Sequence, residues 1–235
     1  MSAAILLLWH AGSISLIRAF VFDFDGVILD TEEPVYRSWL ELYQEHGEEL
    51  PFDRWIQIVG SNNGAFDPRG YLEHRLGRAL SHEEIDRRIE RRSQLVLARA
   101  VLPGVIELAD ASAARGLKLG LASSSSCEWV KGHLERLGIR DRFSCIRCRD
   151  DVQAVKPAPD LYLKALDCLG VAPAEAVAIE DSPNGIAAAK AAGMSCVAVP
   201  NVITGGLDLS GADAVLKSLE GVSPEALAAK LGLTL

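Results

Sequence analysis

Phe20–Thr31 reads Phe-Val-Phe-Asp-Phe-Asp-Gly-Val-Ile-Leu-Asp-Thr, an apolar run that leads into two closely spaced aspartates and a glycine. The apolar run is typical of a buried strand. Because side chains alternate along a strand, Asp23 and Asp25 are expected on the same side, and Gly26 lets the chain turn beside them. Carboxylates are seldom buried without a partner, so the pair indicates a bound cation or shared proton chemistry. An aspartate-rich turn after a strand is the simpler alternative.

After Gly104 the sequence alternates between helical segments and short apolar runs. Helices are expected to end at glycines 116, 138, 170 and 193, and apolar runs follow at Leu117–Ala122, around Phe143–Ile146, at Ala176–Ile179 and at Ser195–Val199. Glycine is favoured just past a helix, and alternating helices and apolar strands predict a parallel sheet covered on both faces. Such sheets bind ligands at the carboxyl ends of their strands.

Residues 34–100 show no strand pattern and are predicted to be an all-helical insertion. Pro34 suits the first turn of a helix to about Leu50, in which apolar residues recur at helical spacing. Ser81-His-Glu-Glu84 is a capping box that opens a second helix to about Arg99. The glycine- and asparagine-rich segment Gly60–Gly70 is expected to be a loop, and Leu102-Pro103-Gly104 the return to the sheet.

Composition restricts the class of protein. The 24 basic and 32 acidic residues among 235 give a net charge of −8 with no long basic run, which disfavours nucleic-acid binding. The five cysteines are odd in number and scattered, which predicts reduced thiols and a cytoplasmic protein. Cys145-x-x-Cys148 has no second pair and no nearby histidine, so Cys145 is interpreted as a core residue and Cys148 as incidental rather than as zinc ligands.

Polar residues follow three of the expected strands. Ser123-Ser-Ser-Ser126 stands at a strand-to-helix junction, where a helix start suits an anion, although a capped loop explains the serines equally well. No Gly-x-Ser-x-Gly motif surrounds them, so a serine-triad hydrolase is disfavoured. Lys156 is flanked by Pro157, and an isolated lysine is ordinarily a solvated charge. Glu180-Asp181 ends an apolar run and precedes a Ser-Pro helix start, which leaves both acids at a buried strand end.

Taken in order, these segments resemble the four motifs of the haloacid dehalogenase superfamily, in its phosphatase and β-phosphoglucomutase branch. The matching strings are Asp23-x-Asp25-Gly26-Val27-x-x-Asp30-Thr31, then Ser123, then Lys156-Pro157, and finally Glu180-Asp181-Ser182-x-x-Gly185. The resemblance extends from Phe20 to about Val199. It implies an α/β fold, with a Rossmann-like parallel-sheet core at 18–32 and 102–235 and an inserted helical cap domain at 33–101 that closes over the strand ends.

The resemblance also implies roles for individual residues. Asp23 would be the nucleophile and Asp25 the general acid and base, with Lys156 offsetting negative charge. The phosphate would be held by Asp25, Gly26, Ser123, Ser124 and Lys156. The expected cofactor is Mg²⁺, which prefers oxygen ligands, held by Asp23, Asp25 (through its backbone carbonyl), Glu180 and Asp181.

Three functions are compatible with these motifs. The leading hypothesis is a Mg²⁺-dependent phosphatase that hydrolyses a small phosphomonoester, with a sugar phosphate as the candidate, through an aspartyl-phosphate. A β-phosphoglucomutase-type phosphomutase shares the same core residues, and a non-catalytic phosphate-binding protein is the third class. The acidic fourth motif disfavours dehalogenation. In the cap loop, Asn62, Asn63, Asp67 and Arg69 are candidate specificity residues, with a solvated loop as the alternative.

The remaining expectations concern the N-terminus and the partners. Residues 1–17 carry a short apolar run, Ile5–Trp9, which fits neither a secretory signal nor a membrane span. In the family that the chain resembles, the motif strand lies close to the N-terminus, so 1–17 is treated as an extension outside the core. The expected partner is a small phosphorylated metabolite. Binding to nucleic acid or to a membrane is not expected, and a monomer is favoured.

Overall fold

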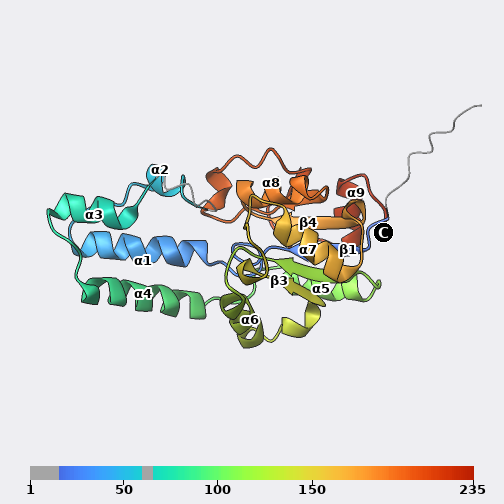
Figure 1. Cartoon of the computed structure of the whole chain (residues 1–235), viewed down its shortest axis with the longest axis horizontal. Coiled ribbons are helices and arrows are strands. Elements are labelled where there is room, and N and C mark those ends of the chain that lie inside the picture. The colour runs from blue at the N-terminus through green and yellow to red at the C-terminus, as the bar shows by residue number, and fades with distance from the viewer. Residues whose placement is uncertain (1–15, 60–65) are drawn as a thin grey trace, which may run out of the picture.

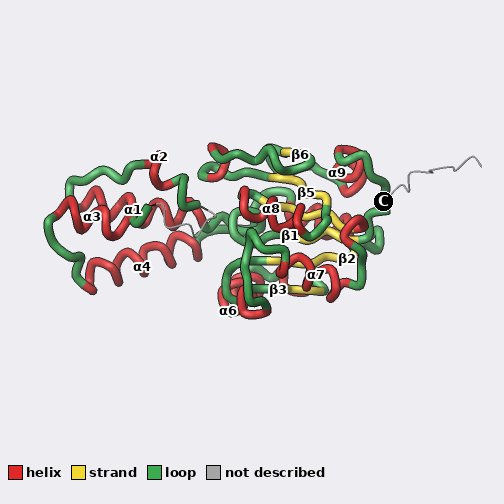
Figure 2. Tube along the Cα trace, turned by 45° about the horizontal axis from the view of Figure 1, so that its top comes forward, coloured by secondary structure: helices red, strands yellow, loops and turns green. Residues whose placement is uncertain are grey.

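The structure is a computed structural model that describes residues 16–59 and 66–235. A six-stranded sheet lies at its centre (Figure 2). Its strand order is β3-β2-β1-β4-β5-β6, and all neighbouring strands run parallel. The strands are β1 (Ala19–Phe22), β2 (Lys118–Ala122), β3 (Cys145–Arg147), β4 (Ala176–Glu180), β5 (Ser195–Ala198) and β6 (Ala214–Val215). The predicted α/β class with a parallel sheet is confirmed, and β1 lies at its centre.

Helices cover both faces of the sheet, as predicted. Side chains of α5 (Val105–Ala113), α6 (Cys127–Arg136) and α9 (Pro224–Lys230) pack on one face, around Phe20 and Phe22 of β1. Those of α7 (Asp160–Leu169) and α8 (Pro183–Ala191) pack on the other face, around Val21. Short 3₁₀ turns lie at Arg140–Arg142, Arg149–Asp151, Pro173–Glu175 and Thr204–Gly206. Because β1 is buried on both faces, its sequence is apolar throughout rather than alternating.

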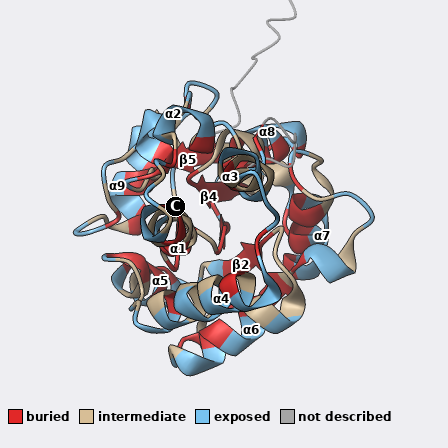
Figure 3. Cartoon of the chain, turned by 90° about the vertical axis from the view of Figure 1, so that its left-hand side faces the viewer, coloured by how far each residue is buried: buried red, intermediate tan, exposed pale blue. Residues whose placement is uncertain are grey.

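Four helices form a separate layer beyond one end of the sheet (Figure 1). They are α1 (Glu32–Glu45), α2 (Phe52–Trp55), α3 (Pro68–Leu76) and α4 (His82–Leu97), and they share a small apolar core of their own. Figure 3, viewed from this end, shows buried strands behind helices such as α4 whose outer sides are exposed. At the start of α4 the predicted capping box is present, since Ser81 accepts from the Glu84 N–H and Glu84 accepts from the Ser81 N–H.

The helical layer is joined to the sheet by two chain segments that run side by side. Leu29 and Val101 form an antiparallel bridge, and the Leu102 N–H donates to the Ile28 carbonyl at 2.9 Å. The two connecting segments therefore meet at one place, next to the predicted return to the sheet at Leu102–Gly104. In the part of the chain that the structure describes, no helix is long and apolar enough to cross a membrane. The domain limits 33–101 stay a prediction.

Three local expectations differ from the structure. Residues 68–70 belong to α3 rather than to a loop, because Asp67 caps the helix through the Arg69 N–H and Pro68 occupies its first turn. Ile17, assigned to the extension, is buried in the core, with its N–H bonded to the Thr234 carbonyl. The short strand β6 was not predicted. Residues 1–15 and 60–65 lie outside the described part of the chain.

The cysteine expectations also need correction. Cys145 on β3 and Cys168 on α7 form a disulfide, because α7 packs against β3 and brings their Cα atoms to 6.2 Å. The prediction of five reduced thiols was therefore wrong for this pair. Cys148 is buried, and its sulfur, the Cys127 sulfur and an Asp151 carboxylate oxygen lie within 4.8 Å of one another.

Candidate active site

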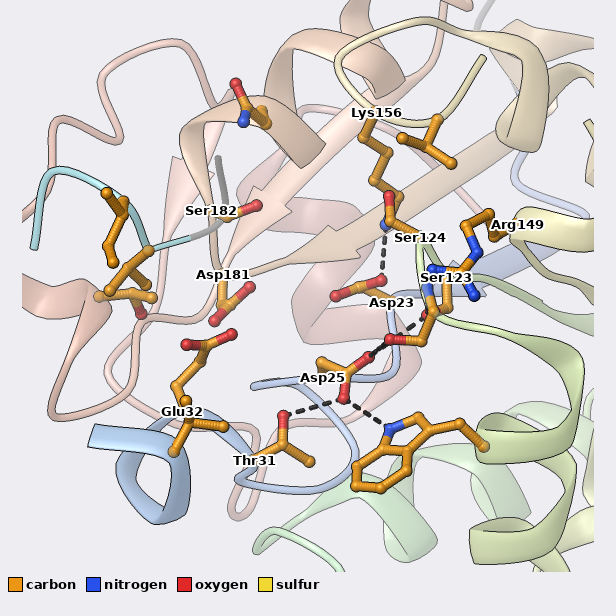
Figure 4. Close-up of a pocket in the computed structure, with 18 of the residues that line it drawn as sticks. Asp23, Asp25, Thr31, Glu32, Ser123, Ser124, Arg149, Lys156, Asp181 and Ser182 are labelled. Carbon is orange, nitrogen blue, oxygen red and sulfur yellow. Dashed lines mark hydrogen bonds and ion pairs between the residues drawn. The ribbon is translucent and has the colours of Figure 1, made fainter. Parts of the chain in front are cut away.

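A cavity of about 730 Å³ lies between the carboxyl ends of the strands and the helical layer. Its core side is formed by residues that follow β1, β2 and β4, together with Lys156 (Figure 4). Its opposite side comes from the helical layer and its connection, namely Thr31, Glu32, Val35, Trp55, Ile58, Val59 and Arg92. The cavity therefore depends on both layers, at the edge of the sheet where ligands of parallel sheets bind.

Asp23 and Lys156 form a buried ion pair on the floor of this cavity. Lys156 Nζ lies 2.6 Å from Asp23 Oδ1 and 2.6 Å from Glu180 Oε1. Tyr162 on α7 donates its hydroxyl to the same Glu180 oxygen at 2.6 Å. Burial by itself would lower the pKa of Lys156, but the charges of Asp23 and Glu180 raise it above its usual value. Lys156 is thus a fixed cation beneath the cavity rather than a solvated surface charge.

Three carboxylates meet beside this lysine. Oxygen atoms of Asp23, Glu180 and Asp181 lie within 4.8 Å of one another, and all three side chains are buried. Burial, together with the neighbouring carboxylates, raises the pKa of Asp23 to about 8 and that of Asp181 well above its usual value. Lys156 alone does not balance these charges. A hard divalent cation with oxygen ligands fits the donor set, and the missing positive charge favours its binding.

Asp25 has a different environment, although it lines the same cavity. Its Oδ1 accepts hydrogen bonds from Thr31 Oγ1 at 2.9 Å and from Trp129 Nε1 at 3.0 Å. Its Oδ2 accepts from Ser125 Oγ at 2.6 Å and from Ser123 Oγ at 3.4 Å. These donors hold the Asp25 carboxylate toward the serine loop after β2, on the side of the cavity away from Asp181 (Figure 4).

Two glycines of the motifs allow this close packing of carboxylates. Gly26 has φ = +85°, and a Cβ at this position would overlap the Asp181 carboxylate. Gly185 on α8 lies against Glu180, whose carboxylate a Cβ at position 185 would also overlap. Neither glycine can carry a side chain without displacing a carboxylate of the cluster. Gly26 was predicted to hold phosphate, but its N–H donates to the Leu29 carbonyl at 2.8 Å.

Of the predicted cap residues, the structure describes only Asp67 and Arg69, and neither lines the cavity. Arg69 lies on α3, is largely exposed and pairs with Glu73 at 2.9 Å, so it is not among the residues that line the cavity. Asn62 and Asn63 fall in the undescribed segment 60–65. Asp67 serves as the N-cap of α3. The predicted core residues Asp23, Asp25, Ser123, Ser124, Lys156 and Asp181 all line the cavity, and Glu180 lies directly beneath it.

Several residues of the site were not predicted individually from the sequence. Trp129, Ser125 and Tyr162 donate hydrogen bonds to its carboxylates, and Asn201 Nδ2 donates to Asp181 Oδ2 at 2.9 Å. Glu32, next to the first motif, faces Asp181 across the cavity, and its burial together with the charges of Asp25 and Asp30 raises its pKa to about 7. Arg92 and Arg149 also line the cavity. Of these residues, Ser125 could have been found by its place in the serine run and Glu32 by its place beside the first motif.

Comparisons with known proteins agree with this fold and site. Residues 17–193 match the family model of haloacid dehalogenase-like hydrolases. The chain is 47% identical over 205 residues to the putative phosphatase YhcW of Bacillus subtilis, covering 87% of this chain and 93% of that protein. It is 33% identical over 220 residues to the β-phosphoglucomutase of the same organism, covering 89% and 93%. The crystal structure of a HAD family hydrolase from Deinococcus radiodurans with bound phosphate and sodium superposes with a TM-score of 0.76 at 26% identity, covering 94% of this chain and 98% of that one.

The fold and site define an enzyme of the phosphatase and phosphomutase type. The chain belongs to the haloacid dehalogenase-like hydrolases, since the family model spans most of its length. Among its relatives are proteins named as phosphatases and a phosphomutase, so it is a phosphoric monoester hydrolase of this family, with the phosphomutase reaction as the alternative.

Proposed function

We propose that the chain hydrolyses a small phosphomonoester in a Mg²⁺-dependent reaction, through a phosphoenzyme formed on Asp23. The observation that carries this proposal is the buried arrangement of Asp23, Lys156, Glu180 and Asp181 on the floor of a cavity closed by the helical layer. A sugar phosphate is the proposed substrate class, because a β-phosphoglucomutase is among the relatives and the cavity of about 730 Å³ accommodates a molecule of that size.

Asp23 is the proposed nucleophile because its carboxylate faces the cavity at the end of the central strand. Lys156 supports the attack by holding Asp23 Oδ1 at 2.6 Å and by placing a positive charge next to the incoming phosphoryl group. An anionic carboxylate would otherwise be repelled by an anionic phosphate. Glu180 holds the lysine ammonium at 2.6 Å, and the Tyr162 hydroxyl fixes Glu180 by donating to the same oxygen.

Asp25 is the proposed general acid and base. Thr31, Trp129 and Ser125 fix its carboxylate near the reacting centre, on the side away from the acidic cluster. From there it protonates the leaving oxygen and then takes a proton from the attacking water. Ser123 and Ser124 line the same side and are proposed to bind phosphate oxygens, with the N-terminus of α6 contributing positive dipole.

Asp23, Glu180 and Asp181 are proposed to hold the Mg²⁺ ion. Such an ion, when bound, neutralises negative charge on the carboxylates and on the transferring phosphoryl group. Asn201 orients Asp181 through its 2.9 Å hydrogen bond, and Gly26 leaves room for that carboxylate. We also propose a cytoplasmic monomer, for which the acidic composition is the support.

A phosphomutase is the second candidate, because the same residues can transfer the phosphoryl group from Asp23 to a sugar hydroxyl instead of water. The product distinguishes the two reactions. A phosphatase releases inorganic phosphate, whereas a mutase converts one sugar phosphate into its isomer and conserves the phosphate.

The test is phosphate release from a panel of phosphomonoesters, in Mg²⁺ or in EDTA, by the unmodified protein and by Asp23→Asn. The proposal expects Mg²⁺-dependent release that Asp23→Asn abolishes. If a bisphosphate primer is present and the sugar phosphate is isomerised without release of inorganic phosphate, the enzyme is a phosphomutase instead. A protein that binds phosphate esters but turns over none of them would contradict both reactions.

A further inference from the structure

We infer that Cys127, Cys148 and Asp151 form a second metal site, which binds a thiophilic divalent cation such as Zn²⁺. Each residue offers one ligand atom, and the three atoms lie within 4.8 Å of one another. The three carboxylates proposed to hold Mg²⁺ offer only oxygen atoms, whereas two sulfur atoms suit zinc and similar softer ions. The inference does not depend on the proposed phosphatase function.

The three ligands come from two chain segments that the sheet brings together. Cys127 is the first residue of α6, which follows β2, whereas Cys148 and Asp151 follow β3, the strand paired with β2. The Cys127 N–H donates to the Asp150 carboxylate, and the Cys148 N–H donates to Asp151 Oδ2 at 2.8 Å. These backbone hydrogen bonds hold the ligands in place before any ion binds.

The spacing of the ligand atoms fits a tetrahedral zinc site. Cys127 Sγ lies 3.6 Å from Asp151 Oδ2, a distance at which the thiol donates a weak hydrogen bond in the metal-free protein. With Zn–S and Zn–O bonds of about 2.3 and 2.0 Å, a sulfur and an oxygen ligand of one zinc ion are about 3.5 Å apart. The Cys148 sulfur adds the third ligand. Because Cys127 and Asp151 are only half-buried, water can take the fourth position.

The two thiols are free to bind a cation. Cys145 and Cys168 form the disulfide, whereas Cys127 and Cys148 are unbonded. Burial raises the pKa of both free thiols, so each keeps its proton until a cation replaces it and the proton passes to the solvent. The ion, two thiolates and one carboxylate then carry a single negative charge, which the positive charge of Lys131, one turn along α6, opposes.

A cation at this site would cross-link two loops beside the active-site cavity. Ser126, directly before Cys127, lines the cavity and caps α6. Trp129, two residues after Cys127, donates its indole N–H to Asp25. Joining Cys127 to Cys148 would therefore tie the start of α6, and the serine loop before it, to the turn after β3. We expect the ion to stabilise this part of the fold and to take no part in phosphoryl transfer.

The test is titration of EDTA-treated protein with Co²⁺ and then Zn²⁺, in excess Mg²⁺ that competes for the carboxylate site. Co²⁺ bound to thiolates has a charge-transfer absorption band that carboxylate ligands do not produce, and Zn²⁺ removes the band by displacing Co²⁺. Cys127→Ser and Cys148→Ser should each strongly reduce the band. Each should weaken Zn²⁺ binding at least about a hundredfold, because losing only an outer partner of a ligand already costs about 10- to 100-fold. Asp151→Asn, which keeps the capping oxygen, should retain the band.

Two control variants separate this site from other cysteines and from the Mg²⁺ site. Cys196→Ala is the matched control, because Cys196 is also a free, buried cysteine but lies on β5 outside the cluster. Asp181→Asn removes one of the carboxylates proposed to hold Mg²⁺. Both variants should keep the thiolate band and the Zn²⁺ affinity of the unmodified protein.

Stability gives a second readout. Zn²⁺ should raise the Tm of the unmodified protein, but not that of Cys127→Ser, which should fold because Cys127 is only half-buried. A count of free thiols before each titration shows that Cys127 and Cys148 are reduced. No thiolate band in the reduced protein would overturn the site. A band or a Zn²⁺ affinity that both serine variants retain would show adventitious binding only, and would overturn it as well.

Discussion

Asp23 and Asp25 line one cavity two residues apart, yet their carboxylates are held by separate groups of partners. Asp23 Oδ1 is 2.6 Å from the Lys156 ammonium, whereas Asp25 accepts from neutral serine, threonine and tryptophan side chains. Lys156 opposes the effect of burial on the pKa of Asp23 and, together with a bound cation, would favour the anionic form that attacks. The donors around Asp25 instead fix the direction of its carboxylate for proton transfer. This difference gives two chemically equal residues the two distinct roles proposed for them.

We predict that Mg²⁺ stabilises the protein more at high pH than at low pH. Burial and neighbouring carboxylates raise the pKa of Asp23 to about 8, and burial with nearby charges raises that of Glu32 to about 7. A carboxyl group whose pKa is higher in the folded than in the unfolded protein stabilises the fold fully below its unfolded-state pKa of about 4. This stabilisation is lost as the pH rises toward the folded-state pKa of about 8. The metal-free protein should therefore lose stability across this range, and Mg²⁺ should restore it.

The measurement is thermal unfolding at several pH values between about 5 and 8, with Mg²⁺ or EDTA. The increase in Tm due to Mg²⁺ should grow with pH, because protons and the cation compete for the same carboxylates. Asp181→Asn should reduce this increase. A Mg²⁺ effect that is constant or declines with pH would contradict the prediction.

Lys156→Met should destabilise the metal-free protein by about 3–5 kcal/mol, because it leaves two buried carboxylates without their cation. Lys190→Met is the control, since Lys190 forms an exposed pair with Asp213 and should cost less than about 1 kcal/mol. Urea denaturation measures both, and phosphate release should be lost only in the first variant. Similar costs for the two lysines would show that the buried pair contributes no more than a surface pair.

Gly26→Ala should cost more than Gly47→Ala, although both glycines have positive φ values of 85° and 70°. A Cβ at Gly47 meets nothing within 4 Å, so that variant carries only the backbone cost of about 1–2 kcal/mol. At Gly26 the Cβ also overlaps Asp181, so the loss of stability should be larger, and the Tm increase caused by Mg²⁺ should shrink. Equal effects would mean that Asp181 moves aside freely.

Trp129→Phe should lower kcat/KM about tenfold, because the indole N–H no longer donates to the Asp25 carboxylate. The phenyl ring retains most of the packing, so the unfolding midpoint should change little. Steady-state rates across a pH series show whether the variant also alters the ionisation that controls catalysis. Trp39→Phe, in the cap beneath Arg88, is the control and should retain the original rates. A loss of stability without a change in rate would assign Trp129 a structural role only.

The sequence by itself determined the sheet, the helical layer and the core of the site. The apolar run before Asp23, the glycines after each helix and the Ser81 capping box are local patterns, and each depends on neighbouring residues in the chain. They predicted the parallel strands, and the motif resemblance identified Asp23, Asp25, Lys156 and Asp181. Because the carboxyl ends of parallel strands share one edge, residues following different strands could be placed together.

Only the tertiary structure decided which other side chains complete the site. Trp129 is 104 residues from Asp25, and their hydrogen bond depends on how α6 packs beside β1. The approach of Arg92 to the cavity depends on how the cap sits on the core, and the Cys145–Cys168 bond depends on α7 lying against β3. These contacts leave no periodic or local signal in the sequence, because they arise from the packing of whole elements that are distant in the chain.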